Sequence, residues 1–132
     1  MPPTPLRLTG LALLAAATLS CIEGDTMAQP TGTADIVVLA QDIDFDHDTY
    51  TLHAGTNTID YLLDGSLPHT LLIEDQTGTV LDFNLEVGDR AGGLDTATIT
   101  LKPGTYTFFC DIPGHRSAGM EAGLVVTASP GR

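Results

Sequence analysis

Three residues whose side chains bind soft metals lie close together near the end of the chain. Cys110, His115 and Met120 are each separated from the next by four residues, and proline and glycine residues stand between them. A step of five residues on an α-helix turns the side chain by roughly 140°. A helix would therefore point the three side chains in different directions, whereas a loop can bring a thiol, an imidazole and a thioether to one point. The stretch 106–120 predicts a metal-binding loop.

The strand expected before this loop gives the cysteine a direction. Tyr106, Phe108 and Cys110 alternate along the sequence, which places them on one face of a β-strand. If the two aromatic rings face the core, the sulfur of Cys110 faces it too. An inward cysteine is either a metal ligand or an inert small hydrophobic residue.

A fourth ligand is expected from elsewhere in the chain. A copper ion that cycles between Cu(I) and Cu(II) is typically held by one thiolate, two imidazoles and a weak axial thioether. His69 follows a proline and has the same parity as Leu71 and Ile73, so we expect it to point inward at the end of the fold. His47 stands among four aspartates and His53 ends a strand, so we expect both at the surface.

Other interpretations of the loop are weaker. Cys110, His115 and Met120 could be a buried thiol, a loop histidine and a core methionine with coincidental spacing. Zinc is disfavoured because structural zinc sites usually contain two or more cysteines. A cysteine–histidine nucleophile would compete with metal binding for the thiolate. Multicopper oxidases need many more than the four histidines present, and a binuclear copper centre needs a second cysteine on this loop.

The rest of the chain after residue 34 has the pattern of β-strands. Short runs of β-branched and apolar residues alternate with turn residues, and no window shows helical periodicity. We therefore predict an all-β sandwich of seven or eight strands. The strands are expected at 35–39, 49–53, 58–63, 70–74, 80–85, 96–101, 105–110 and 122–127, with turns at 54–57, 64–66, 76–78 and 102–104. Residues 86–93 are expected to form a loop that includes a helical turn.

Length and charge limit the classes of function. A chain of 132 residues accommodates one domain. Its net charge of −12, from 17 acidic and 5 basic residues, argues against binding to nucleic acid or to anionic membranes and favours a basic partner.

The N-terminus has the features of an export leader. A small and apolar run follows Arg7 and is too short to span a bilayer. We interpret residues 1–28 as a signal peptide with a lipoprotein anchor at Cys21, and cleavage after Ala28 is the competing interpretation. Residues 23–33 are expected to form a disordered tether, and residues 34–128 the folded domain. A Cys21–Cys110 disulfide is disfavoured because Cys21 belongs to the leader.

The Pro-His pair at 68–69 and the spacing Cys110-x4-His115-x4-Met120 resemble the cupredoxins, or type 1 blue copper proteins. The resemblance extends from the first strand to Thr127, and the loop spacing is closer to rusticyanin-like and sulfocyanin-like members than to plastocyanin. It implies a Greek-key β-sandwich with one copper at one end. His69, Cys110 and His115 would be the strong ligands and Met120 the axial one. Thr70 stands where many members carry an asparagine that ties the two ligand segments together. A hydroxyl can replace part of that link, so the departure bears on the tuning of the copper and its redox potential and not on the identity of the metal.

The resemblance also implies a function. We expect an exported, monomeric electron carrier, not an enzyme, that exchanges single electrons with a cytochrome, an oxidase or a reductase. A copper-delivery or copper-resistance protein is the alternative. Electrons would pass through a surface-reaching His115, with Ile112, Pro113 and Ala118 around it as an apolar docking patch. Arg116 is interpreted either as a solvated side chain or as a residue that selects an acidic spot on the partner.

Overall fold

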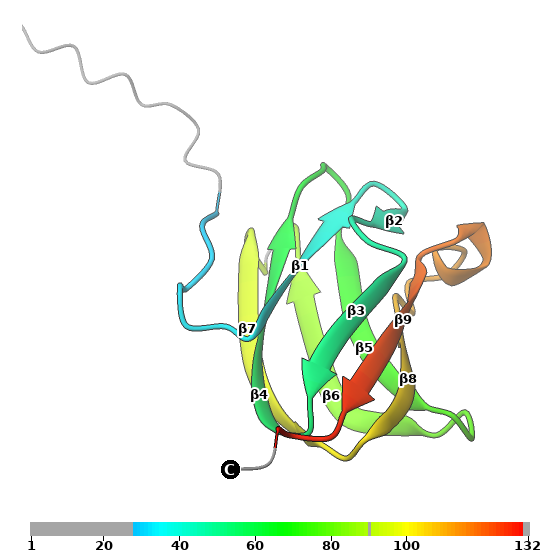
Figure 1. The fold of residues 1–132 in the computed structure, drawn as a ribbon. Helices are drawn as coiled ribbons and strands as arrows, with labels where there is room; N and C mark the ends of the chain where they lie inside the picture. Colours follow the sequence, from blue (N-terminus) through cyan, green and yellow to red (C-terminus); the bar gives the residue numbers. More distant parts are fainter. Residues whose placement is uncertain (1–27, 90, 131–132) are drawn as a thin grey trace, which may run out of the picture.

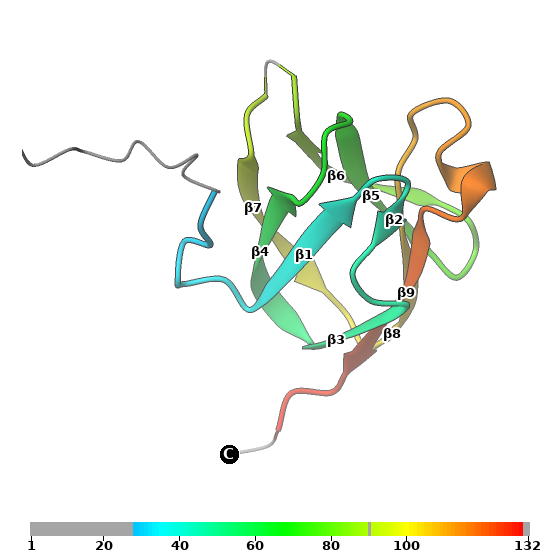
Figure 2. The ribbon, with the colours of Figure 1, turned by 90° about the horizontal axis from the view of Figure 1, so that it is seen from above.

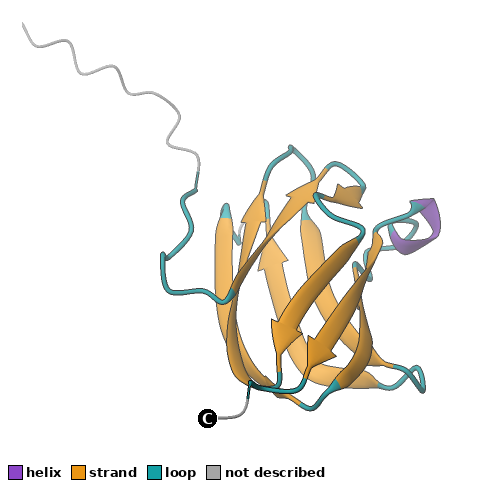
Figure 3. Ribbon diagram, in the orientation of Figure 1, coloured by secondary structure: helices purple, strands orange, loops and turns teal. Residues whose placement is uncertain are grey.

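The chain folds into two β-sheets packed face to face (Figures 1 and 3). The computed structural model describes residues 28–89 and 91–130. One sheet has the strand order β2-β1-β4-β7 and the other the order β3-β9-β8-β5-β6. The elements are β1 (Ile36–Gln41), β2 (Asp44–Phe45), β3 (Thr49–His53), β4 (Gly55–Leu63), β5 (His69–Asp75), β6 (Val80–Val87), β7 (Leu94–Leu101), β8 (Gly104–Phe109), the 3-10 helix η1 (Arg116–Ala118) and β9 (Glu121–Thr127).

The strands form because apolar side chains alternate with polar ones. In β3, Tyr50 and Leu52 are buried while their neighbours are exposed, and β6 and β9 repeat this pattern. The inward residues of both sheets form one hydrophobic core. Completely buried members include Val38, Ile59, Tyr61, Leu71, Ile73, Phe108 and Leu124. The predicted all-β sandwich is confirmed.

The sheets are connected as a Greek key. β1 pairs in parallel with β4, and β3 pairs in parallel with β9, although these strands are not consecutive. The remaining pairs are antiparallel, as Figure 2 allows the reader to follow from above. In particular, β5 runs antiparallel to β8, with Leu72 opposite Phe109. The start of β5 therefore lies beside the end of β8, which brings His69 next to Cys110.

Three local predictions were wrong. β4 begins at Gly55, inside the predicted turn 54–57. The buried Asn57 amide donates hydrogen bonds to the carbonyls of His53 and Gly55, so the chain reverses within fewer residues than the predicted turn. The two-residue strand β2 was not predicted. The loop predicted at 86–93 begins only at Gly88. β6 continues to Val87, and a tight turn follows in which Gly88 pairs with Gly92.

The segment before β1 is attached to the sandwich. Thr31 donates hydrogen bonds from its backbone N–H and its hydroxyl to Asp60 Oδ2, at 2.6 and 2.9 Å. Asp60 lies in β4 and is completely buried, so its carboxylate needs such donors. The prediction of a disordered tether is therefore wrong around Thr31. The predicted leader, apart from Ala28, and its Cys21 lie outside the described residues, and no described helix is long and apolar enough to cross a membrane.

Candidate metal centre

Three of the predicted ligands converge at the end of the sandwich where β5 begins and β8 ends. One donor atom each from His69, Cys110 and His115 lies within 4.8 Å of the other two. The two Nδ1 atoms of the histidines are 3.2 Å apart, and the Cys110 sulfur is 3.6 Å from Nδ1 of His115. Cys110 and His69 are buried, and His115 is partly exposed.

The spacing of these donor atoms suits a single metal ion. Bonds of about 2.0–2.1 Å to imidazole nitrogen and about 2.3 Å to thiolate sulfur separate three donors in a plane by about 3.5–3.8 Å. The two distances above are close to these values. Cys110 carries a free thiol, and one thiolate with two neutral imidazoles is a donor set that suits copper. The residues present therefore fit the cofactor.

Met120 belongs to the same end of the fold. Its side chain is completely buried. Its backbone N–H donates to the carbonyl of His115 at 3.0 Å, and its own carbonyl accepts from the N–H of Cys110 at 3.2 Å. These two backbone hydrogen bonds close the loop, with Cys110 directly after β8 and Met120 directly before β9.

A short 3-10 helix shapes the loop between His115 and Met120. Helix η1 begins directly after His115 and ends at Ala118, and the next residue is Gly119, whose φ of 116° lies in the left-handed region. The N–H of Gly119 donates to the carbonyl of Arg116 and ends the turn. A side chain at Gly119 would be strained in this conformation.

Thr70 connects the two ligand-bearing segments. Its hydroxyl accepts the backbone N–H of Asp111 at 3.0 Å and donates to Oδ1 of Asp111 at 2.7 Å. Both the hydroxyl and the backbone N–H of Thr70 lie 3.4 Å from the Cys110 sulfur. Because the single hydroxyl hydrogen is closer to Asp111, the N–H is the donor that remains for the sulfur. The Thr70 hydroxyl therefore links the segment that carries His69 to the loop that follows Cys110.

The environment of the site opposes a charged His69. Burial, and then the charge of His115, lower the pKa of His69, while Asp42 acts in the opposite direction. Burial, and then the charge of Cys110, raise the pKa of Tyr61 well above its ordinary value. The Tyr61 hydroxyl donates to the carbonyl of Thr70 at 3.1 Å, directly after His69. The lowered pKa of His69 favours its neutral form, which is the form that binds a metal.

Arg116 is partly exposed and makes contacts within the chain that neither interpretation from the sequence included. Its guanidinium forms a bidentate ion pair with Glu74 of β5. A second ion pair joins Nε of Arg116 to Oε2 of Glu121 in β9 at 2.6 Å. It also lies over the Phe109 ring of β8, 4.2 Å from the centroid. The Arg116 side chain is therefore paired within the chain, and it attaches η1 to β5, β8 and β9. Sequence alone gave no sign of this because Glu74 lies 42 residues away.

The other two histidines are placed as predicted. His47 is exposed and lies 2.6 Å from the Asp46 carboxylate. His53 is exposed and contacts the Thr127 hydroxyl at 3.1 Å. Neither belongs to the cluster at the end of the sandwich.

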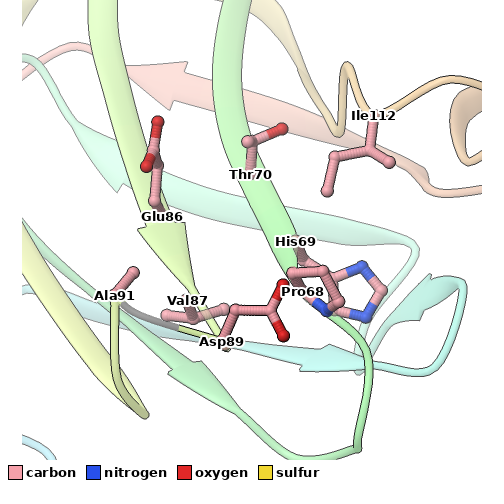
Figure 4. A pocket seen from close by; sticks show the side chains of 9 residues that line it. Pro68, His69, Thr70, Glu86, Val87, Asp89, Ala91 and Ile112 are labelled. Carbon is pink, nitrogen blue, oxygen red and sulfur yellow. The ribbon is translucent and has the colours of Figure 1, made fainter.

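A surface hollow lies beside His69 (Figure 4). Pro68 and Ile112 contribute apolar surface to it, and Glu86 and Asp89 contribute carboxylates from the β6 side. The buried histidine thus has an acidic surface next to it, which agrees with the acidic composition of the chain.

The fold and the donor set define a β-sandwich protein that binds one metal ion at one end of the sandwich. The sequence profile of the copper-binding plastocyanin/azurin family matches residues 33–127. The chain belongs to this family, and its cofactor is a single type 1 copper. The resemblance to the cupredoxins and the expected cofactor are confirmed.

Solved structures of related proteins agree with the fold. Reduced auracyanin from the photosynthetic bacterium Roseiflexus castenholzii has 21% identity and a TM-score of 0.58, covering 71% of this chain and 95% of its own. An azurin from Methylomonas sp. strain J has 17% identity and a TM-score of 0.56, covering 69% and 95%. Plastocyanin from Dryopteris crassirhizoma has 24% identity and a TM-score of 0.52, covering 70% and 100%. Comparison with curated protein sequences gave no match.

Proposed function

We propose that the chain is an electron carrier, not an enzyme, in which His69, Cys110 and His115 would hold the copper and Met120 would be a fourth, weaker ligand. The observation that carries the proposal is the convergence of one thiol and two imidazoles within 4.8 Å. When bound, copper supplies a centre that changes by one electron between Cu(I) and Cu(II). A donor set fixed by the fold keeps the ligands in place during this change, so that little rearrangement accompanies the transfer.

The surface around His115 is the proposed route for electrons. His115 is partly exposed, whereas the other proposed strong ligands are buried. Pro113 and Ala118 beside it are exposed, and Ile112 is half-buried. An apolar patch of this kind lets a redox partner approach closely without desolvating charges. The acidic remainder of the surface favours a partner with a basic face.

The test is a one-electron redox titration of the copper-loaded protein. We expect one electron per chain, full reversibility, and exchange of electrons with a soluble cytochrome while the copper stays bound. His69→Ala should weaken copper binding, and the exposed His47→Ala is the matched control that should leave it unchanged. If the protein instead passed its copper to a chelating acceptor before exchanging electrons, copper delivery would be the better account. An unchanged copper affinity of His69→Ala would show that the fourth ligand was wrongly assigned.

We also propose that the protein is exported, acts as a monomer, and is attached to the membrane through a lipid on Cys21. Export and the lipid anchor are supported by the small and apolar run that follows Arg7 and ends at Ser20, directly before Cys21. Replacement of Cys21 by serine should move the protein from the membrane fraction to the soluble fraction of the cell. Cleavage after Ala28 would leave the wild-type protein soluble.

A further inference from the structure

The nitrogen of His69 that faces away from the three donors is buried without a partner. His69 is 1% exposed, and its Nε2 atom has no hydrogen-bond partner among the described residues. Its Nδ1 atom faces His115. An imidazole that binds a metal through Nδ1 must carry its hydrogen on Nε2. Copper binding therefore creates a buried donor that needs an acceptor.

The Asp42 carboxylate lies next to this nitrogen. Its Oδ1 atom is 3.7 Å from Nε2 of His69, slightly beyond hydrogen-bond distance. Asp42 belongs to the turn between β1 and β2, on a different sheet from His69. A shift of less than 1 Å would bring the pair to the usual donor–acceptor distance of about 2.9 Å.

The carboxylate is held in this place by the loop that leads into His69. Oδ1 accepts the backbone N–H groups of Ser66 and Leu67 at 2.9 and 3.1 Å, and Oδ2 accepts the Ser66 hydroxyl at 3.0 Å. Gly65 makes room for it, since a Cβ atom there would lie 2.3 Å from Oδ1. The carboxylate and the histidine are therefore fixed to the same short loop, so their relative position is well defined.

We propose that Asp42 is a positioning residue of the copper site, whose carboxylate accepts the Nε2–H of His69 and whose negative charge favours Cu(II) over Cu(I). A carboxylate behind a metal-bound histidine fixes the orientation of the ring and raises its basicity as a ligand. The inference rests on the proposed function, because it requires His69 to bind copper. It goes beyond that proposal by assigning a role to a residue that does not touch the metal.

The experiment compares three copper-loaded proteins with the wild type. Asp42→Ala removes the acceptor and the charge, and Asp42→Asn removes the charge but keeps an acceptor oxygen. Asp64→Asn is the matched control, because Asp64 is an exposed aspartate near the same end that accepts a hydrogen bond from Gln41. The readouts are the reduction potential, the Cu(II) affinity, and the Nε2–H signal of His69 in NMR spectra of the diamagnetic Cu(I) protein.

We expect both Asp42 variants to have a raised reduction potential relative to Asp64→Asn. Asp42→Ala should also bind Cu(II) about tenfold more weakly, and its Nε2–H should exchange with solvent much faster than in Asp42→Asn. If Asp42→Ala does not fold, the potential of Asp42→Asn decides. A wild-type protein that is blue and redox-active, with Asp42 variants that match Asp64→Asn in potential, would overturn this inference alone. A wild type that binds no copper would overturn the proposed function and this inference with it.

Discussion

Thr70 stands at the point where the two ligand-bearing segments touch. Its hydroxyl accepts from the N–H of Asp111 and donates to the carboxylate of the same residue. A single side chain thus closes the contact between the start of β5 and the loop after Cys110. Because the cysteine and the first histidine lie on these two segments, the hydroxyl helps to preserve the donor spacing in the absence of metal.

Replacement of Thr70 by valine should therefore destabilise the metal-free protein. Valine keeps the shape but leaves the N–H of Asp111 without its acceptor, so we expect the free energy of unfolding to fall by about 1–2 kcal/mol. Denaturant titration of the metal-free protein measures this loss. Thr70→Ser is the control, because it keeps the hydroxyl, and equal stabilities of the valine and serine variants would contradict the assigned role.

At the scale of elements, the loop that carries His115 is attached to the sandwich through η1. Arg116 joins this helix to Glu74 in β5, to Glu121 in β9 and to the Phe109 ring in β8. The hydrogen bond and charge of Arg116 hold the pKa of Glu74 below its ordinary value. The charge of Glu74 thus stabilises the folded state, and this contribution depends on pH.

The sign of this dependence follows from the lowered pKa. Stabilisation by Glu74 is fully present above the ordinary glutamate pKa of about 4.3, and it is lost as the pH falls through the lower pKa of the folded state. Glu74→Gln should cost about 1 kcal/mol at pH 7, a modest value because Arg116 is partly exposed and solvent screens the pair. In denaturant titrations, the difference between wild type and Glu74→Gln should shrink below about pH 4. A difference that stayed constant down to pH 3 would contradict the ion pair.

Local patterns of the sequence predicted the elements well where the pattern was long enough. The strand 49–53 was predicted to the residue because its alternation of polar and apolar side chains is strict. Strand β2 was missed because two residues in an aspartate-rich segment show no period. The start of β4 was misplaced because a buried side chain, Asn57, takes over the role of turn residues.

For the candidate site, the sequence predicted the metal ligands but not the side chains that support them. Strand parity and loop composition indicated that His69, Cys110 and His115 would meet, and their donor atoms do lie together. The contacts of Asp42 and Arg116 were not predictable, because they depend on how separate loops approach one another across the fold. Side chains that support a site from a distance leave no periodic signal in a single sequence.

At the scale of the whole molecule, the net charge of −12 should govern how the protein meets the redox partners proposed for it. Glu86 and Asp89 line the hollow beside His69, so negative charge extends to the copper end of the sandwich. Opposite charges on two partners accelerate their encounter at low ionic strength. Salt weakens this effect, because at 0.1 M it largely screens charges that are more than about 10 Å apart.

Electron exchange with small charged reagents should reveal this field. We expect the rate of oxidation by a cationic complex to fall about tenfold or more as salt is raised from a few millimolar to about 0.2 M, and the rate with an anionic complex to rise. Stopped-flow kinetics measure both, with a neutral complex as the control. Equal salt dependence for the cationic and anionic reagents would show that the charge does not act at the site of electron exchange.

The central claim is that one copper ion is bound through the sulfur of Cys110 at the end of the sandwich. The visible absorption spectrum of the protein loaded with one equivalent of Cu(II) tests it most directly. We predict an intense blue band from thiolate-to-copper charge transfer, which Cys110→Ser abolishes while the protein stays folded. A colourless or weakly absorbing wild-type complex, or a band of equal intensity in Cys110→Ser, would contradict the account.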